Sequence, residues 1–575
     1  MKALVEPKIR YSLLPKLSSV LRKKFPSYSE TLLQLLANRD LLTSKTTEAE
    51  LEALLNPDFE TGLHDPWLMP NVKQAVKRIE AAVKAGELIT VYGDYDADGI
   101  PGTAILVETL QRLGAKVDYL IPARDVDGYG LSNGPIDRLI DRGTKLIITV
   151  DCGIRSVEAV GYAKSKGIEA IVTDHHELGD KLPETIIVHP GLPKSKYPDP
   201  GLCGAGVAYK LAAALVSEFP DKFDSGFLKW ELDLVAISTV ADVVPLRGEN
   251  RVLAHYGLVV LRKTRRLGLQ ALYKVAVIEP EKITPVTVGF GIAPRINAPG
   301  RLADAEDSLR LLLTKDEKEA RRLALELQRA NLERQDQTQR VLDEAISLVE
   351  SDPDKHIYVL AGPWPTGILG IVAGRLAEKY YRPVIVIGGG GETLKGSARS
   401  IPELDITKLL ERSAKELIQC GGHPAAAGLS LKSERLQAFR ELITNQAERA
   451  LVEVDLRPSR RVDMELGFSE IVPGLWKDLC KLEPYGMGNP EPVFQARAEV
   501  VAVRCVGNGE KHLKLQLRQG EVVLDAIGFR MGGVEVEVGE KVETIFKVKE
   551  NSWNGSTKLE LQLVDILPTK AAEAV

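Results

Sequence analysis

The chain has 575 residues, and its 75 Lys and Arg against 80 Asp and Glu give a formal net charge of −5 at pH 7. This length exceeds what one hydrophobic core supports and predicts about three to four domains. The negative charge argues against a protein that coats nucleic acid non-specifically, although an acidic chain can carry a local basic groove. No apolar run approaches the roughly 18 residues that span a bilayer, and five scattered cysteines without a CxxC pair are typical of a reducing compartment. We therefore expect a cytoplasmic protein that does not enter a membrane.

Residues 1–70 show helical periodicity broken by polar stretches, and they predict a helical N-terminal segment. From residue 71 helices alternate with short apolar strands, which predicts an α/β domain over residues 71–314. Its strands are expected at residues 88–92, 146–150 and 170–173. Continuous β-branched runs that alternate with helices are typical of a parallel sheet covered on both faces.

Residues 315–350 contain no Gly or Pro, and their apolar residues recur at helical spacing, which predicts one long connecting helix. Apolar residues are absent from Glu333 to Arg340. A helix with such a polar middle is expected to bridge two domains through solvent. A single packed helix or a coiled coil is the alternative, although apolar a and d positions are not sustained along the segment.

Residues 351–450 predict a second, smaller α/β domain. The last region, residues 451–575, ends in five short alternating strands with glycine-rich turns, which favours a small β-barrel and above all an OB-fold. OB-folds bind single strands through a basic groove and aromatic stacking. For Phe529 and Phe546 in this region, filling of the barrel interior is favoured over stacking on a strand.

Carboxylates and imidazoles follow three consecutive predicted strands at the points where the strands end. In an open parallel sheet the ligand site lies beyond the carboxyl ends of the strands, so these groups should converge. Clustered carboxylates repel one another, and divalent cations remove that repulsion. Oxygen ligands with one or two imidazoles suit Mn²⁺ or Mg²⁺. The groups are Asp94, Asp96 and Asp98 after the first strand, Asp151 after the second, His175 and His176 after the third, and Asp242 after a later apolar stretch.

Each of these aspartates taken alone is about equally typical of a helix N-cap or a turn. The repetition at three strand ends, together with a His-His pair, favours a two-metal phosphodiesterase site for the group as a whole.

The motifs GDYDADG, VDCG, TDHHE and ADVVPL resemble the four successive motifs of the DHH phosphoesterase superfamily. Within it the chain is most similar to the RecJ family of bacterial single-strand-specific 5′→3′ exonucleases. The resemblance extends to LCGAGVAYKL, PRINAPGRL, GILGIVAGRLAEKYYRPVIVI, GGHPAAAG and LEPYGMGNPEPVF, in the family's order over most of residues 75–495. The chain departs from the family pattern at Pro101 and Pro365.

The resemblance implies a role for each ligand candidate. Asp151 would bridge two cations about 3.5–4 Å apart, as in other two-metal phosphodiesterases. Asp94 would hold one cation, and Asp96, His175 and Asp242 the other. His176 would contact the scissile phosphate, with metal ligation as the alternative, and Asp98 would orient the motif loop.

The resemblance also implies that residues 71–314 form the DHH catalytic domain and residues 351–450 a DHHA1 domain that binds substrate. An arginine beside backbone amides suits a phosphate. For an individual arginine, a solvated or structural ion pair is an equally good interpretation. The implied substrate-binding residues are Arg124, Arg295, Arg301, Ser397, Arg399, Gly422 and His423.

The function that follows is a single-stranded-DNA-specific 5′→3′ exonuclease that releases 5′-mononucleotides with two Mn²⁺ or Mg²⁺ ions in DNA repair and recombination. The resemblance implies that a strand threads between the two α/β domains of a monomer. A helicase and a single-strand-binding protein are the expected partners. The alternatives are a DHH phosphodiesterase of short oligonucleotides or cyclic dinucleotides, and a DNA-binding scaffold without activity.

Overall fold

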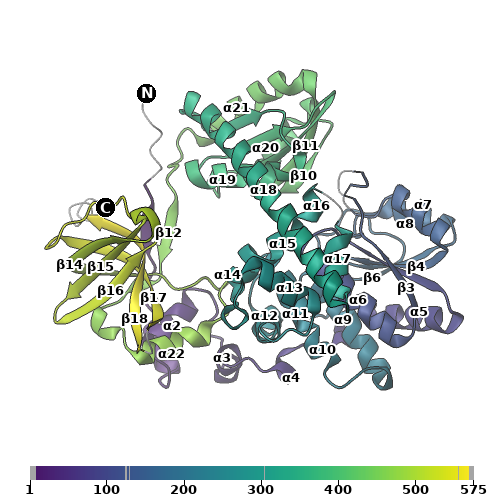
Figure 1. The fold of residues 1–575 in the computed structure, drawn as a ribbon, viewed down its shortest axis with the longest axis horizontal. Helices are drawn as coiled ribbons and strands as arrows, with labels where there is room; N and C mark the ends of the chain where they lie inside the picture. Colours follow the sequence, from purple (N-terminus) through teal and green to yellow (C-terminus); the bar gives the residue numbers. More distant parts are fainter. Residues whose placement is uncertain (1–7, 124–125, 129, 303–304, 554–555, 569–575) are drawn as a thin grey trace. The chain divides into compact units, whose positions relative to one another are not determined.

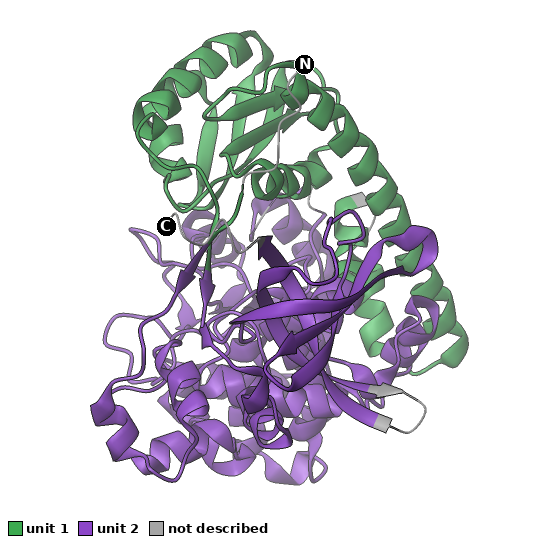
Figure 2. Cartoon of the chain, turned by 90° about the vertical axis from the view of Figure 1, so that its left-hand side faces the viewer, with its two compact units in different colours: residues 1–10, 294–460 green, residues 11–293, 461–575 purple. Residues whose placement is uncertain are grey.

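The structure, a computed structural model, describes residues 8–123, 126–128, 130–302, 305–553 and 556–568 (Figure 1). It divides into two compact units (Figure 2). One unit is built on Pro294–Arg460, and the other combines Tyr11–Ala293 with the chain from Arg461 onward. Within the described residues, no helix combines the length and apolar character needed to cross a membrane.

A five-stranded sheet, with every neighbouring pair parallel, forms the centre of the second unit, in the order β3-β2-β4-β5-β6. Its three central strands are almost wholly buried and mostly apolar, because helices cover both faces. The strands are β2 (Leu88–Gly93), β3 (Lys116–Leu120), β4 (Thr144–Val150), β5 (Glu169–Thr173) and β6 (Ile186–Val188). Five helices pack on them: α5 (Val72–Ala85), α6 (Gly99–Leu113) and α9 (Gly204–Glu218), and also α7 (Asn133–Arg142) and α8 (Val157–Ser165).

Further helices follow in the same unit, of which α10 and α11 contact α9, and α12 packs on α11. The most deeply buried of them is α11, whose residues from Leu232 to Thr239 are all buried and mostly apolar. These helices are α10 (Phe227–Trp230), α11 (Leu232–Ala241), α12 (Gly248–Leu261) and α13 (Leu267–Ala276).

The C-terminal strands close into a five-stranded barrel in the ring order β14-β15-β16-β18-β17, with β17 pairing back to β14. This confirms the predicted barrel. Phe546 lies in its core as predicted, but the prediction for Phe529 is wrong, since that side chain is 56% exposed. The elements are α22 (Pro473–Leu482), β14 (Phe494–Val506), β15 (His512–Gln519), β16 (Val522–Gly528), β17 (Lys541–Trp553) and β18 (Ser556–Pro568).

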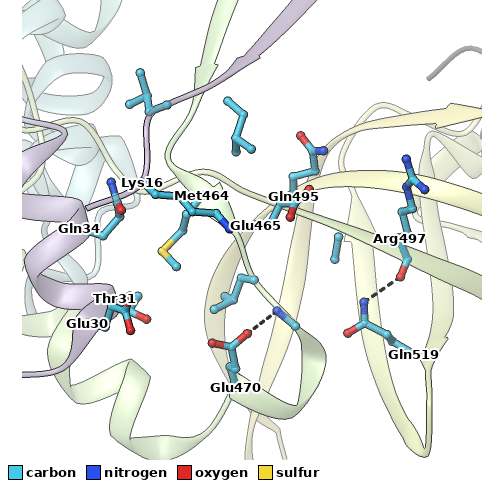
Figure 3. Close-up of a pocket in the computed structure, with 15 residues that line it drawn as sticks. Lys16, Glu30, Thr31, Gln34, Met464, Glu465, Glu470, Gln495, Arg497 and Gln519 are labelled. Atoms are coloured by element: carbon cyan, nitrogen blue, oxygen red, sulfur yellow. Dashed lines mark hydrogen bonds between the residues drawn. The ribbon is translucent and has the colours of Figure 1, made fainter. Parts of the chain in front are cut away.

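The N-terminal helices pack against this barrel and α22 in one shared hydrophobic core, far apart in sequence but together in space. A buried ion pair between Arg39 and Asp463 (2.7 Å) joins the two segments. Between them lies a cavity of about 770 Å³ that mixes acidic and basic side chains, among them Lys16, Glu465 and Arg497 (Figure 3). These helices are α1 (Ser19–Lys24), α2 (Glu30–Ala37) and α3 (Glu48–Leu55), whereas α4 (Phe59–Gly62) packs on α12.

The first unit carries a mixed sheet in the order β10-β11-β9-β8-β7, with hydrophobic cores on both faces. Its strands are β7 (Tyr358–Ala361), β8 (Val384–Gly388), β9 (Thr393–Arg399), β10 (Gln419–His423) and β11 (Ala426–Lys432). Its helices are α15 (Ala293–Asn297), α16 (Pro299–Leu302), α17 (Glu306–Leu313), α18 (Glu317–Ser351), α19 (Leu369–Tyr380), α20 (Ile406–Arg412) and α21 (Leu436–Leu451).

The predicted long helix is present as α18, which begins after the capping carboxylate of Asp316. Its polar middle does not run wholly through solvent, so that part of the prediction is wrong. Thr338 is buried within this stretch and Asn331 is buried just before it, and Arg334 lies between them on the same face of the helix. The sequence pattern of polar residues did not distinguish a solvated face from a buried polar one.

Candidate active site

Three backbone hydrogen bonds extend the parallel sheet and place an aspartate just beyond each of three strands. The N–H of Asp94 donates to the last carbonyl of β4 (3.1 Å), and the N–H of Asp151 donates to the last carbonyl of β5 (3.0 Å). The N–H of Asp174 donates in the same way to the end of β6 (3.3 Å). Because neighbouring strands lie about 4.8 Å apart, the three aspartates form one row at the carboxyl edge of the sheet.

The turn after β2 holds Asp96 and Asp98 in different ways. One oxygen of Asp96 accepts the N–H groups of Asp98 (2.8 Å) and Gly99 (3.1 Å), so Asp96 caps the start of α6. The two oxygens of Asp98 accept the N–H groups of Gly204 (2.7 Å) and Ala205 (2.7 Å) at the start of α9. The carboxylate of Asp98 is therefore buried and held in the site by a second helix.

The first turn of α9 lies very close to Asp151 because Gly204 has no side chain. A Cβ on Gly204 would lie 2.5 Å from the Cβ of Asp151. Asp151 has a φ of 62°, a left-handed conformation in which Asp is several-fold enriched among non-glycine residues. Backbone strain of this kind clusters at functional sites.

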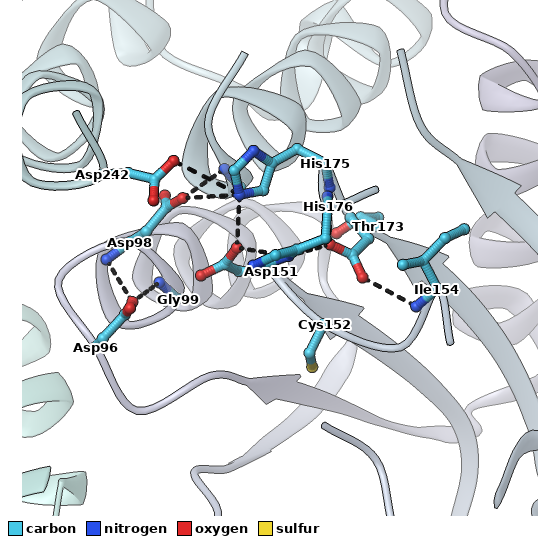
Figure 4. Close-up of polar contacts among 12 residues, drawn as sticks. Asp96, Asp98, Gly99, Asp151, Cys152, Ile154, Thr173, His175, His176 and Asp242 are labelled. Carbon is cyan, nitrogen blue, oxygen red and sulfur yellow. Dashed lines mark hydrogen bonds and ion pairs between the residues drawn. The ribbon is translucent and has the colours of Figure 1, made fainter. Parts of the chain in front are cut away.

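His175 lies at the centre of the carboxylates (Figure 4). Its Nε2 atom is 3.1 Å from an oxygen of Asp151, 3.6 Å from one of Asp98 and 3.7 Å from one of Asp242. Asp242 follows the last residue of the buried helix α11, which brings it to the site from a distant part of the chain.

Asp174, to which the sequence interpretation gave no role, holds His176 in place. One oxygen of Asp174 accepts the N–H groups of His175 (2.7 Å) and His176 (3.1 Å) and lies 2.8 Å from Nδ1 of the His176 ring. The other oxygen accepts the N–H of Ile154 (2.9 Å). Burial by itself lowers the pKa of His176, but the hydrogen bond and charge of Asp174 outweigh that effect and raise it.

His189 is a second positioning residue that sequence reasoning missed. The N–H of Gly191 donates to Nδ1 of His189 (2.9 Å), so its Nε2 donates to the carbonyl of His176 (2.8 Å). The signal available in the sequence was a histidine that directly follows the apolar run 186–188.

The departure at Pro101 removes one backbone donor, and a side-chain hydroxyl takes its place. Pro101, the third residue of α6, has no N–H, whereas its neighbours Ile100 and Gly102 donate theirs to the carbonyls of Asp96 (2.9 Å) and Asp98 (3.1 Å). The carbonyl of Ala97, four residues earlier, accepts the hydroxyl of Ser238 (3.1 Å).

Among the residues that the structure describes, three groups of side chains have ligand atoms within 4.8 Å of one another. Carboxylate oxygens with imidazole nitrogens are the donor set expected for Mn²⁺ or Mg²⁺. The structure places Asp98, rather than Asp96, with His175 and Asp242. The groups are Asp94, Asp96 and Asp151; Asp98, His175 and Asp242; and Asp151, His175 and His176.

The electrostatics of this cluster favour a bound cation. Burial raises the pKa of the Asp151 carboxyl well above its usual range, and the charges of the aspartates after β2 add to the rise. Burial also raises the pKa of Asp98, and that of Asp242 to about 8, whereas it lowers the pKa of His175. A divalent cation would relieve the repulsion that holds these carboxyl pKa values high.

Four of the predicted substrate-binding residues gather on adjacent strands of the first unit's sheet. Ala426 of β11 pairs with Arg399 of β9 on one side and with His423 of β10 on the other. Ser397 and Gly422 lie within two residues of this row. Gly370 in α19 leaves room for this group, since a Cβ on it would lie 3.0 Å from Ser397 Oγ and 3.4 Å from an Arg399 nitrogen.

The other predicted arginines have different surroundings. Arg295 Nε donates to the side chain of Gln328 (2.7 Å), and Arg301 donates to the carbonyl of Gly367 (2.8 Å), which ties α16 to the turn before α19. The prediction for Arg124 lies outside the described residues.

Sequence reasoning missed Arg334 and Arg375, which lie near Arg295 in the first unit. Burial lowers the pKa of Arg334, and the positive charges of Arg375 and Arg295 lower it further. Guanidinium groups gathered in this way are typical of a site for an anion such as phosphate. The signal was the polar stretch of α18, which had been assigned to solvent.

Family models match three regions of the chain. Residues 88–239 match the DHH family N-terminal domain, residues 352–449 the DHHA1 domain and residues 462–565 the RecJ OB domain. The fold and the site define a phosphoesterase of the DHH class.

Similar proteins identify the family within this class to which the chain belongs. The single-stranded-DNA-specific exonuclease RecJ of Bacillus subtilis is 40% identical over 525 residues, which cover 90% of this chain and 66% of that protein, just under two thirds. The protein of the same name from Haemophilus influenzae is 35% identical over 556 residues, which cover 92% of this chain and 94% of that protein. The crystal structure of Thermus thermophilus RecJ in complex with Mn²⁺ has a TM-score of 0.83 at 32% identity, covering 97% of this chain and 79% of that one. The chain belongs to the RecJ family.

Proposed function

We propose that this chain is a metal-dependent exonuclease that removes 5′-mononucleotides from the 5′ end of single-stranded DNA and acts in DNA repair and recombination. The main support for this proposal is the cluster of carboxylates and imidazoles at the carboxyl edge of the parallel sheet. This cluster lies in a chain whose relatives are named single-stranded-DNA-specific exonucleases. The same proposal includes a helicase and a single-strand-binding protein as partners. It also includes a cytoplasmic location and a monomeric state.

The donor set fits two divalent cations, Mn²⁺ or Mg²⁺. We assign one to Asp94, Asp96 and Asp151 and the other to Asp98, His175 and Asp242, with Asp151 near both. When bound, such a pair supplies an activated water as nucleophile and neutralises charge on the phosphate. This assignment moves Asp96 to the cation held by Asp94, and it gives Asp98 the ligand position that the resemblance implied for Asp96.

The protein's own groups position the substrate. A raised pKa keeps more of His176 protonated near neutral pH, so that its ring can donate a hydrogen bond to a phosphate oxygen, while Asp174 orients the ring and His189 holds the backbone. Ser397, Arg399, Gly422 and His423 are assigned to the terminal 5′-phosphate, together with Arg295, Arg334 and Arg375 along the strand. Arg124 and Arg301 stay predictions.

The activity is tested with DNA labelled at either end, single-stranded or duplex, with Mn²⁺, Mg²⁺ or EDTA. We expect labelled mononucleotides from the 5′ end of single strands only, and no release in EDTA. Hydrolysis confined to dinucleotides or cyclic dinucleotides would instead favour the small-substrate phosphodiesterase. DNA binding without hydrolysis under either metal would favour a scaffold.

The assignment of Asp98 is tested by double-mutant cycles on Mn²⁺ affinity. Because Asp98 and Asp242 share one ligand group, we expect Asp98→Asn and Asp242→Asn to be strongly non-additive. Asp96→Asn, the matched control, should instead couple with Asp94→Asn. Coupling of Asp96 with Asp242 would restore the assignment that the resemblance implied.

For Asp174→Asn we expect kcat to fall by about 10–100-fold, the usual effect of removing a partner that orients a functional histidine. Because the carboxylate raises the pKa of His176, its removal should also move the alkaline limb of the pH–rate profile toward lower pH. A lower kcat with an unmoved profile would mean that Asp174 serves only the fold. The measurement is kcat and KM on single strands between pH 5 and 9.

A further inference from the structure

A basic pocket lies in the same unit as the proposed metal ligands, but none of those ligands lines it. Its volume is about 480 Å³, and it is formed by the 3₁₀ turn η1 (Pro66–Leu68), the first turns of α5 and the loop that follows β6. None of the described side chains that line it is acidic. Its charged lining, which we call the lysine pocket, consists of Lys73, Lys77, Lys194 and Lys196, with Trp67 beside them.

The arrangement of these lysines works against the stability of the chain. Lys73 and Lys77 are four residues apart on one helix face, where like charges repel. Lys73 lies in the first turn of α5, where the helix dipole disfavours a positive charge, and no acidic residue offsets it there. Across the described parts of the chain, no carboxylate forms an ion pair with any of the four lysines.

The backbone around the lysine pocket is also strained. Lys194 and Asn71 both have left-handed conformations, with φ of 65° and 60°. Asn71 is held there because its side chain donates to the carbonyl of Ile187 in β6 (2.7 Å). Unrelieved charge and left-handed backbone at one exposed pocket point to a ligand rather than to folding.

We propose that the lysine pocket is a second, non-catalytic nucleotide-binding site. The lysines would hold a nucleotide phosphate, and Trp67, whose ring N–H donates to Ser217 Oγ (3.4 Å), would contact the base or sugar. A basic groove beside an aromatic ring is the combination that binds single-stranded nucleic acid. An acidic peptide is disfavoured, because a pocket of about 480 Å³ has the size of a small-ligand site.

The sheet places this pocket beside the proposed chemistry. The pocket loop follows His189, whose ring holds the backbone of His176. β6 lies two strands from β4, or about 10 Å along the carboxyl edge of the sheet. A nucleotide there is either a released mononucleotide or part of a bound strand, and both present the same phosphate.

The test is photocrosslinking to the full chain in EDTA, so that its readout does not depend on hydrolysis. The probes are 5-iodo-dUMP and a 12-nucleotide single strand carrying one 5-iododeoxyuridine, and mass spectrometry locates the adduct. We compare the wild type with a variant in which the four pocket lysines are replaced by glutamine. The matched control replaces four exposed lysines elsewhere in the same domain. They lie at the starts of β3 and β4 and at the end of α8: Lys116, Lys145, Lys164 and Lys166.

We expect an adduct on Trp67 that falls at least about tenfold in the pocket variant and is unchanged in the control. Labelling by 5-iodo-dUMP alone identifies a mononucleotide site, and labelling only by the strand identifies a strand contact. No adduct at Trp67 with either probe, or an equal loss in both variants, would overturn the proposal. A polyglutamate peptide that binds the lysine pocket when neither probe does would overturn it in favour of a protein partner.

Discussion

Replacing Asp151 by alanine is expected to lower the rate of single-strand hydrolysis by at least about 10³-fold, which corresponds to several kcal/mol of transition-state stabilisation. Asp151 belongs to two of the three candidate ligand groups, so its loss affects both proposed cations at once. Binding of single strands should survive, because the proposed phosphate contacts lie on other residues. The measurements are kcat on labelled DNA, Mn²⁺ stoichiometry by calorimetry and the Kd for DNA in EDTA.

The matched control is Asp141→Ala, which removes an exposed aspartate from the last turn of α7. That variant should keep the wild-type rate and Mn²⁺ stoichiometry. An Asp151→Ala enzyme that retained more than about a tenth of the activity would show that Asp151 does not link the two cations, a loss of less than about 1.4 kcal/mol.

The second large effect is expected at Arg266, where Arg266→Met should lower the free energy of unfolding by about 3–5 kcal/mol, as when one partner of a buried ion pair is removed. Its guanidinium contacts Glu108 (2.6 Å), Glu231 (2.6 Å) and Asp233 (3.2 Å), and its side chain is only 8% exposed. The substitution would leave three buried carboxylates without a cation. Urea denaturation monitored by circular dichroism measures the change.

This destabilisation should grow with pH. Burial raises the pKa of Glu231 to about 8 even beside Arg266, because one guanidinium faces three carboxylates. A carboxyl whose folded pKa lies above its unfolded value, about 4.3, contributes stability at low pH that is lost as pH rises through the folded pKa. Without Arg266 the folded pKa rises further, so the deficit should be larger at pH 8 than at pH 5.

The control for this prediction is Arg321→Met, which removes a 70% exposed partner of Glu317 on α18. It should change the free energy of unfolding by less than about 1 kcal/mol, the usual range for an exposed pair. A similar small change in Arg266→Met would mean that the three carboxylates are neutralised by protons rather than by the arginine.

The sequence by itself determined the parts of this protein that depend on short-range pattern. Runs of β-branched residues between helices specify buried parallel strands, and such strands must end at a common edge, so Asp94, Asp151 and His175 could be brought together without coordinates. Five short strands with glycine-rich turns likewise specified the C-terminal barrel.

Only the tertiary structure decided which side chains lie together in each candidate ligand group. Asp96 and Asp98 are two residues apart and look alike in sequence, but the first caps its own helix while the second is bound by N–H groups more than 100 residues away. The polar stretch around Arg334 was predicted to be solvated. The prediction failed because burial depends on which segments pack against a helix, and helical periodicity does not specify those segments. The lysine pocket likewise could not be predicted from the sequence, because Lys73 and Lys194 line the same pocket only when α5 packs beside β6.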